Sequence, residues 1–101
     1  MILYNVTIKP DWDIHEAWVE WMKGEHFNDM QSTGLIKRCQ LLRLLDMDES
    51  DGPTYACQYF LDGLADYQEY LDKFADDMRQ RGDRLWAGKY VAFRSLMEIV
   101  N

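Results

Sequence analysis

The period of the apolar residues changes along this chain, and these changes restrict its possible folds more than any other feature. Apolar and polar residues alternate from Ile2 to Ile8, which indicates a strand. From Ile14 to Met22 the apolar residues recur at helical spacing, and a Thr-Gly pair at 33–34 is expected to end that helix. The chain is therefore predicted to open with a strand followed by a helix.

The middle of the chain has the pattern of a β-hairpin. Residues 35–47 and 54–61 are rich in branched and aromatic side chains, which favour strands. Between them lies Asp48-Glu49-Ser50-Asp51-Gly52-Pro53, a run typical of turns. We expect two antiparallel strands here, with the first at an edge of the sheet.

A second helix and a last strand complete the pattern. Apolar residues recur at steps of three and four from Leu64 to Met78, and this helix is expected to end near Gly82. Alternation returns from Tyr90 to Val100, which predicts a strand. The order βαββαβ predicts an α+β, ferredoxin-like fold, with a four-stranded antiparallel sheet ordered 4-1-3-2 and both helices on one face. A chain of 101 residues leaves no room for a second domain, so residues 1–101 are expected to form one domain.

The sheet face away from the helices, called the bare face below, is predicted to be too apolar for water. We expect the bulkier residues of each strand to face the helices, and those of the last strand are Val91, Phe93, Met97 and Ile99. The bare face would then carry Leu3, Ala56, Phe60, Ala92, Leu96 and Val100. Two helices cannot cover both faces, so the pattern predicts a symmetric homodimer whose sheets pack face to face.

Charge and motifs argue against several partners. The chain has 18 acidic and 11 basic residues and a net charge of -7, which opposes binding to nucleic acid and to anionic membranes. No nucleotide-binding glycine pattern or metal-binding cysteine pair occurs, so neither a cofactor nor a metal is expected. Residues 1–10 lack the basic and apolar pattern of a secretion signal, so none is expected, and Cys39 and Cys57 are predicted to be out of register on neighbouring strands. Reduced thiols and a cytoplasmic location are expected.

Four segments give the chain a resemblance to a known family. They are YNVTI at 4–8, HEAWVEWMKGEH at 15–26, TYACQYF at 54–60 and VAFRSLMEIV at 91–100. Through these segments the chain resembles the bacterial domain of unknown function 4286 family, and the resemblance spans nearly the whole chain. That family is similar to the dimeric α+β barrels, which include cofactor-free monooxygenases, lactone isomerases and ligand-sensing domains. The resemblance implies that the one domain expected over residues 1–101 is a dimeric α+β barrel domain, and function carries over only as analogy.

His26 is the first candidate for chemistry. Histidine titrates near neutral pH, and His26 falls near the end of the first helix, which borders the cavity mouth in the related barrels. We predict a catalytic proton acceptor. The alternative is a half-buried histidine whose ring is hydrogen-bonded within the fold.

A polar group is expected on the bare face. With the strand order above, Asn5, Thr7, Gln58 and Arg94 would converge there within an apolar surround, which is the composition of a small-molecule pocket. Arg94 could hold a carboxylate or an enolate oxygen. The alternative is a buried polar network that fixes the register of the dimer, or an Arg94–Glu98 ion pair.

Glu25 and Trp18 are further candidates for ligand binding. Glu25 falls on the apolar stripe of the first helix, where a carboxylate needs a partner such as an arginine or a ligand, unless it leans out to solvent. Trp18 would stack on a ligand or anchor the core.

We therefore expect a small-ligand-binding barrel. It would perform cofactor-independent chemistry, of a monooxygenase or isomerase kind, on a small carbonyl or aromatic compound. The alternative is a non-catalytic homodimer with a ligand-sensing or structural role.

Overall fold

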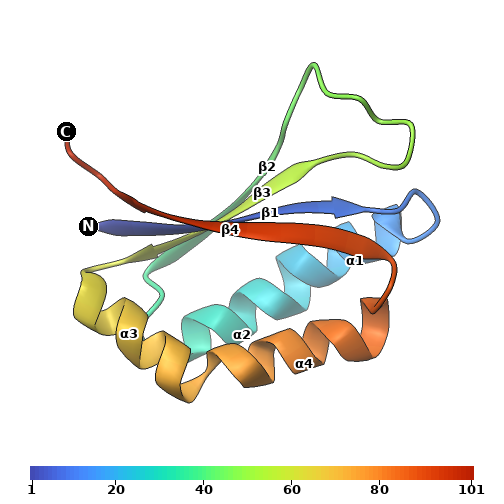
Figure 1. The fold of residues 1–101 in the computed structure, drawn as a ribbon. Coiled ribbons are helices and arrows are strands. Elements are labelled where there is room, and N and C mark those ends of the chain that lie inside the picture. Colours follow the sequence, from blue (N-terminus) through green and yellow to red (C-terminus); the bar gives the residue numbers. More distant parts are fainter.

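Four antiparallel strands form one sheet in the computed structural model, which describes all residues 1–101. The strands are β1 (Ile2–Pro10), β2 (Arg38–Arg43), β3 (Tyr55–Leu61) and β4 (Tyr90–Glu98). Their order across the sheet is β2-β3-β1-β4 (Figure 1). The predicted topology is confirmed, including the edge position of β2, which is shorter than the expected 35–47.

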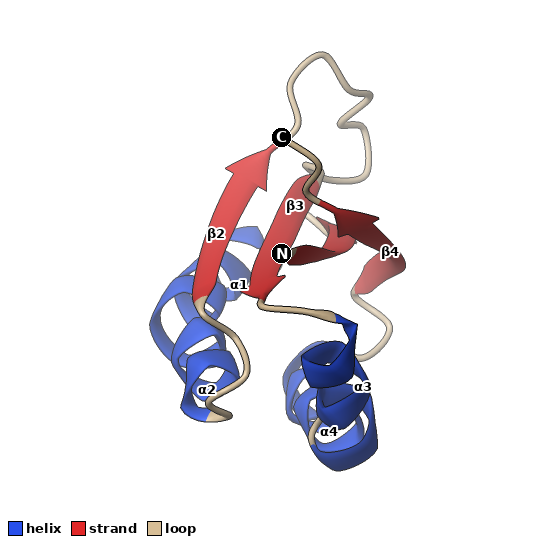
Figure 2. Ribbon diagram, turned by 90° about the vertical axis from the view of Figure 1, so that its left-hand side faces the viewer, coloured by secondary structure: helices blue, strands red, loops and turns tan.

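Two helical arms lie on one face of the sheet (Figure 2). The first arm runs without interruption through α1 (His15–Trp21), a π turn η1 (Met22–His26) and α2 (Phe27–Ser32). The second arm consists of α3 (Leu64–Lys73) and α4 (Ala75–Trp86). No helix of either arm is both long and apolar enough to cross a membrane.

The second helical arm differs from the predicted helix in two ways. It breaks at Phe74, whose φ of -127° departs from helical geometry and separates α3 from α4. It also continues past Gly82 to Trp86, because a glycine inside a helix lowers its stability without stopping it. The longer α4 brings Trp86 beneath the sheet.

Aromatic and sulfur-containing side chains dominate the core between the sheet and the arms. Trp18 of α1 is only 2% exposed and its ring lies 5.2 Å from that of Tyr55. The largest fully buried residues also include Tyr59, Met22 and Met30. The first arm therefore supplies most of the packing beneath β3.

The faces of β4 are the reverse of the prediction. Directly opposite residues of an antiparallel pair point to the same face, and Val6 of β1 lies opposite Arg94. Since Val6 faces the helices, Arg94 does too, together with Ala92 and Leu96. Val91, Phe93 and Met97 therefore point to the bare face, where the side chains of Val91 and Phe93 are 67% and 64% exposed.

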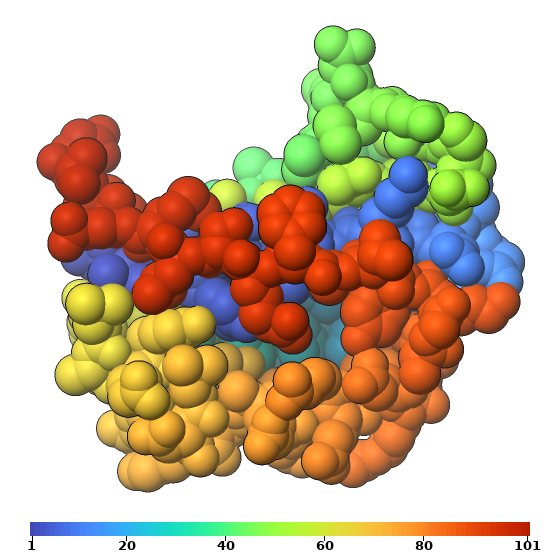
Figure 3. Space-filling model, in the orientation of Figure 1, coloured from blue at the N-terminus to red at the C-terminus, as the bar shows by residue number.

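The physical reason for this reversal is a hollow beneath β4. α4 runs below β4 without filling the space between them (Figure 3). Small or polar-tipped side chains fit above such a hollow, so the bulky apolar residues of β4 lie on the other face. The bare face is still apolar, as predicted, but through Val91, Phe93 and Met97 in place of Ala92, Leu96 and Val100.

The two cysteines are free thiols. Cys39 lies opposite Tyr59 and Cys57 opposite Leu41, so the predicted offset between them is confirmed. Burial raises the pKa of Cys39 to about 11, which keeps that thiol protonated at neutral pH.

Candidate functional site

A cavity of about 330 Å³ lies between the helical arms and the helix-facing side of β1 and β4. Its mouth opens beneath β4, where β1 and the first arm are visible through the hollow (Figure 3). Twenty residues line it and 15 of them are hydrophobic. A mostly apolar cavity of this size with a few polar groups is typical of a small-molecule site.

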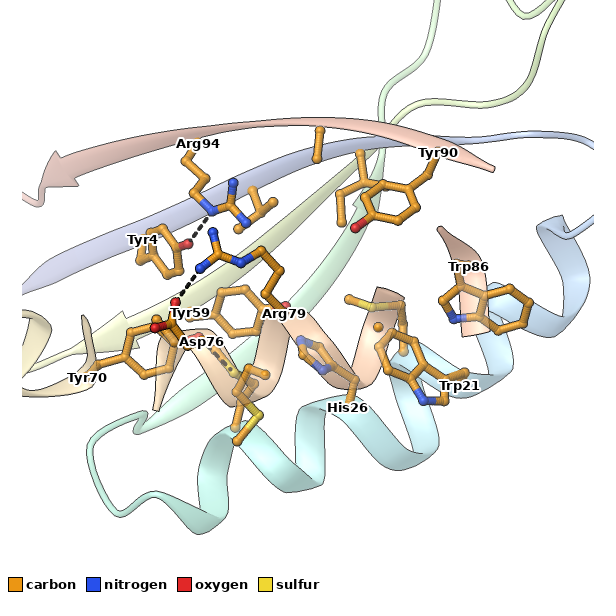
Figure 4. Close-up of a pocket in the computed structure, with 18 of the residues that line it drawn as sticks. Tyr4, Trp21, His26, Tyr59, Tyr70, Asp76, Arg79, Trp86, Tyr90 and Arg94 are labelled. Carbon is orange, nitrogen blue, oxygen red and sulfur yellow. Dashed lines mark hydrogen bonds and ion pairs between the residues drawn. The ribbon is translucent and has the colours of Figure 1, made fainter. Parts of the chain in front are cut away.

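The π turn η1 places His26 in the cavity wall. The amide of Phe27 donates to the carbonyl of Met22, five residues earlier, so this turn holds one residue more than an α-helical turn. The ring of His26 stacks on that of Trp21 at 4.8 Å, and Tyr59 lies edge-on at 6.2 Å. Figure 4 shows the imidazole pointing from the first arm into the cavity.

His26 is neutral at pH 7. Burial lowers the pKa of its ring to about 4, opposed by the nearby carboxylate of Asp29 and assisted by the charge of Arg81. Its Nδ1 atom is buried and has no hydrogen-bond partner. At Nδ1 the ring therefore lacks the hydrogen bond within the fold that the alternative predicted.

Two arginines meet at the mouth of the cavity. Arg94 of β4 donates from Nε to the hydroxyl of Tyr4 over 2.9 Å. Arg79 of α4 pairs with Asp76, one turn earlier in the same helix. Figure 4 shows both guanidinium groups pointing toward each other, with the Tyr4 hydroxyl beside them.

Tyrosines form the wall behind the arginines. The ring of Tyr4 lies 5.8 Å from that of Tyr59 and 5.9 Å from that of Tyr70. Burial raises the pKa of all three hydroxyls, although the charge of Arg94 opposes this for Tyr4 and Tyr70. These hydroxyls are therefore neutral donors at physiological pH.

Two tryptophans close the opposite end. Trp21 and Trp86 meet edge to face with 6.3 Å between ring centroids, and one comes from each arm. Trp86 Nε1 is buried without a partner. This end of the cavity is apolar and aromatic, in contrast to the charged mouth.

Three of the predicted residues, His26, Trp18 and Arg94, line the cavity. Arg94 reaches it from the helix-facing side, so its predicted position on the bare face is wrong. Arg94 donates a hydrogen bond to the hydroxyl of Tyr4 and does not form the ion pair with Glu98 that was the suggested alternative. Arg94 therefore lines the same cavity as His26.

Asn5, Thr7 and Gln58 lie on the bare face as predicted, separated from His26 by the sheet. The Asn5 amide donates to the Thr7 hydroxyl over 3.0 Å, while Gln58 accepts from Gln40 over 2.6 Å. Asn5 Oδ1 is buried without a partner. Without Arg94 these side chains form a small polar island in an apolar face, and they do not line the cavity.

Glu25 also lies outside the cavity. Its carboxylate accepts a hydrogen bond of 2.9 Å from Trp21 Nε1 on an exposed part of the helix. This partner is neither an arginine nor a ligand. Glu25 orients the indole of Trp21, which in turn stacks on His26.

Sequence reasoning missed Arg79, Tyr4 and Trp86 as cavity residues. One signal was available for Arg79, because Ala75, Arg79, Gly82 and Trp86 follow each other at helical steps of four, three and four. Small residues on such a stripe leave space beside a helix. Nowhere in the chain do three or more potential metal-ligating side chains come together.

A family model described as a domain of unknown function, DUF4286, matches residues 1–100. No curated protein matches the chain. Among solved structures, the chain is similar to an antibiotic biosynthesis monooxygenase, with 13% identity, a TM-score of 0.70 and all of both chains covered.

Two further solved structures are similar. One is an ethyl tert-butyl ether d (ethd) family protein from Bacillus halodurans, with 15% identity, a TM-score of 0.66 and coverage of 99% of this chain and 100% of that chain. The other is a hydroxynitrile lyase from Passiflora edulis, with 12% identity, a TM-score of 0.61 and coverage of 99% and 96%. At these identities the likeness shows the fold alone, and the predicted ferredoxin-like fold of the α+β barrels is confirmed.

Proposed function

Since this chain belongs to the DUF4286 family of domains of unknown function, we propose a function from its own cavity: it binds small aromatic or carbonyl compounds, and His26 accepts a proton from them. One observation carries this proposal. The cavity of about 330 Å³ is lined by the imidazole of His26, which is neutral and for which the fold provides no partner at Nδ1. A neutral imidazole nitrogen accepts protons, and a positioned general base contributes about 100-fold to 10,000-fold to a rate. The low pKa of His26, about 4, makes its ring a weak base and favours the lower end of that range.

The proposed step is removal of a proton from a carbon next to a carbonyl group. The C–H electron pair moves into the enolate, the proton moves to the unprotonated ring nitrogen of His26, and the negative charge collects on the carbonyl oxygen. The guanidinium of Arg94 would stabilise that oxygen. Return of the proton to another carbon gives isomerisation. Reaction of the carbanion with dioxygen and a proton gives a hydroperoxide, which loses water as its O–O bond breaks and leaves one oxygen atom on that carbon as a carbonyl.

Relatives of similar fold support small-ligand binding in this cavity. The solved structures of similar fold are described as monooxygenases and as a lyase, and one, called MhuD, has two manganese protoporphyrin IX molecules bound per active site. These descriptions apply to those proteins. For this chain they favour a barrel whose cavity takes organic ligands.

Solvent exchange tests the proposed step without knowledge of the natural substrate. A neutral enolisable aromatic ketone, 2-indanone, is incubated with the protein in D₂O, and loss of its α-proton signal is followed by NMR. We expect saturable acceleration over buffer. Binding without acceleration would favour the alternative of a non-catalytic ligand-sensing dimer. Absence of binding would overturn both the proposed proton transfer and the ligand-sensing alternative.

We further propose that the chain forms a homodimer through the bare face. Phe93 and Val91 are about two-thirds exposed there, and Met97 lies on the same face. An apolar sheet face of this kind is stable in water when a second sheet packs on it.

Phe93→Asp is therefore expected to convert a dimer into a monomer, because it would bury an unpaired charge at the interface. Sedimentation at micromolar concentration measures the result. The matched control is Leu64→Asp, at a residue that is 62% exposed at the start of α3, and it should stay dimeric. A monomeric unsubstituted protein would contradict the proposal.

A further inference from the structure

We propose that the ligand of this cavity carries a carboxylate, and that Arg79, Arg94 and the hydroxyl of Tyr4 bind that carboxylate at the cavity mouth. This inference rests on the proposed function and narrows its ligand class. It concerns recognition, so it holds whether or not proton transfer follows.

The charges at the cavity leave one positive charge without a partner. Among the lining residues, Arg79 and Arg94 face only one carboxylate, that of Asp76. Asp83, just outside the lining, accepts a hydrogen bond of 2.6 Å from the hydroxyl of Tyr90 and pairs with neither arginine. His26 is neutral because burial lowers the pKa of its ring. An apolar hollow with one surplus positive charge fits a ligand with a single negative charge, such as a carboxylate.

Some hydrogen-bond donors at the mouth also lack an acceptor within the protein. Arg94 uses Nε for the Tyr4 hydroxyl and forms no ion pair, so its two terminal nitrogens are free. Tyr4 accepts this hydrogen bond and still has its own hydroxyl proton to donate. The planar fork of a guanidinium matches the two oxygens of a carboxylate, and the neighbouring hydroxyl supplies a third donor.

Asp76 has the position and chemistry of a substitute for the ligand. Its carboxylate pairs with Arg79 within α4, and its side chain is 83% exposed. An exposed pair one helical turn apart is weak, so a ligand carboxylate can replace it. The rest of the ligand would then extend toward the apolar end formed by Trp21 and Trp86.

The experiment compares two probes of the same shape, 2-naphthoate and 2-naphthamide, by calorimetry at pH 7 and low salt. We expect the carboxylate to bind about 10-fold more tightly than the amide, the effect of one charge-assisted hydrogen-bonded pair. Arg79→Gln and Arg94→Gln should each remove most of this difference, so the loss of affinity should be larger for naphthoate than for naphthamide.

Three variants serve as controls. Arg84→Gln removes one positive charge from α4 outside the cavity and should have no effect. Arg94→Lys keeps the charge but loses the planar fork, so it should weaken naphthoate binding. This variant replaces Arg94→Gln as the test if Arg94→Gln does not fold. Asp76→Asn should strengthen naphthoate binding a few-fold, because it removes the competing carboxylate.

Equal affinities for both probes would overturn the carboxylate site and leave the proposed small-molecule cavity intact. Failure of both probes to bind would overturn both proposals. A loss with Arg84→Gln as large as that with Arg79→Gln would also overturn the site, since it would indicate nonspecific attraction between the probe and basic residues.

Discussion

Replacing His26 with glutamine is expected to slow the deuterium exchange of 2-indanone by about 100-fold or more. Glutamine can hydrogen-bond in the same cavity wall but cannot accept and return a proton at neutral pH. Ketone affinity should change little, because the cavity keeps its aromatic walls. NMR exchange rates, combined with affinities from the concentration dependence, separate these two effects.

The pH dependence follows from the burial of His26. Its pKa is lowered to about 4, so the ring is neutral above pH 5 and the exchange rate should be independent of this group there. The rate should fall as the pH drops through about 4, where protonation removes the accepting nitrogen. A fall centred near 6.5, the ordinary pKa of histidine, would contradict the assigned environment.

The other histidine provides a matched control. His15 lies in α1 outside the cavity, with its Nε2 2.6 Å from the hydroxyl of Tyr55. His15→Gln should leave the exchange rate unchanged. If His26→Gln exchanges as fast as the unsubstituted protein, the proposed role of His26 is wrong.

The neutral state of His26 should also be detectable in the pH dependence of protein stability. The unfolded chain binds a proton at this residue below about pH 6.5, whereas the folded chain binds it only below about pH 4. The contribution of His26 to the free energy of unfolding is therefore fully present above about pH 6.5 and decreases as the pH falls from about 6.5 to about 4. His26→Gln should remove this part of the acid sensitivity in urea titrations.

Trp18→Ala is expected to reduce the free energy of unfolding by about 3–5 kcal/mol, the usual cost of removing a large buried aromatic side chain. Trp18 is 2% exposed and packs on Tyr55 beneath β3. Because small domains are stable by only about 5–15 kcal/mol, this loss is a large fraction of the total. Urea unfolding followed by circular dichroism measures it.

The control for this prediction is Trp12→Ala. Trp12 is 47% exposed and donates one hydrogen bond to the carbonyl of Glu49, so its loss should cost only about 1 kcal/mol. Similar losses in the two variants would contradict the role of Trp18 as the core anchor beneath β3. Trp18 would then be a better candidate for stacking on a ligand.

The order and pairing of the elements could be predicted from the sequence, because they follow from local periodicity. Which side chains of β4 face the helices could not be predicted in this way. Val91, Phe93 and Met97 alternate with Ala92, Arg94 and Leu96, so both faces of the strand carry apolar residues. Choosing between them requires knowledge of the hollow beneath the strand, which is a property of how α4 packs.

The candidate site could be predicted only in part for the same reason. His26 was identified because its side chain is rare and titratable, and its position depends mainly on one helix. Arg79 and Trp86 belong to α4, whose approach to the sheet depends on the break at Phe74. No glycine or proline marks that break, so the sequence offered no local signal for it.

The π turn in the first arm also has a consequence for evolutionary comparison. An extra residue within a helix rotates everything after it by about 100° relative to what precedes it. A related chain without the extra residue at 22–26 would align with a one-position gap inside a continuous helix, and its residue equivalent to His26 would point elsewhere. Such a gap would mark a branch of the family that has kept the fold and lost the inward-facing imidazole.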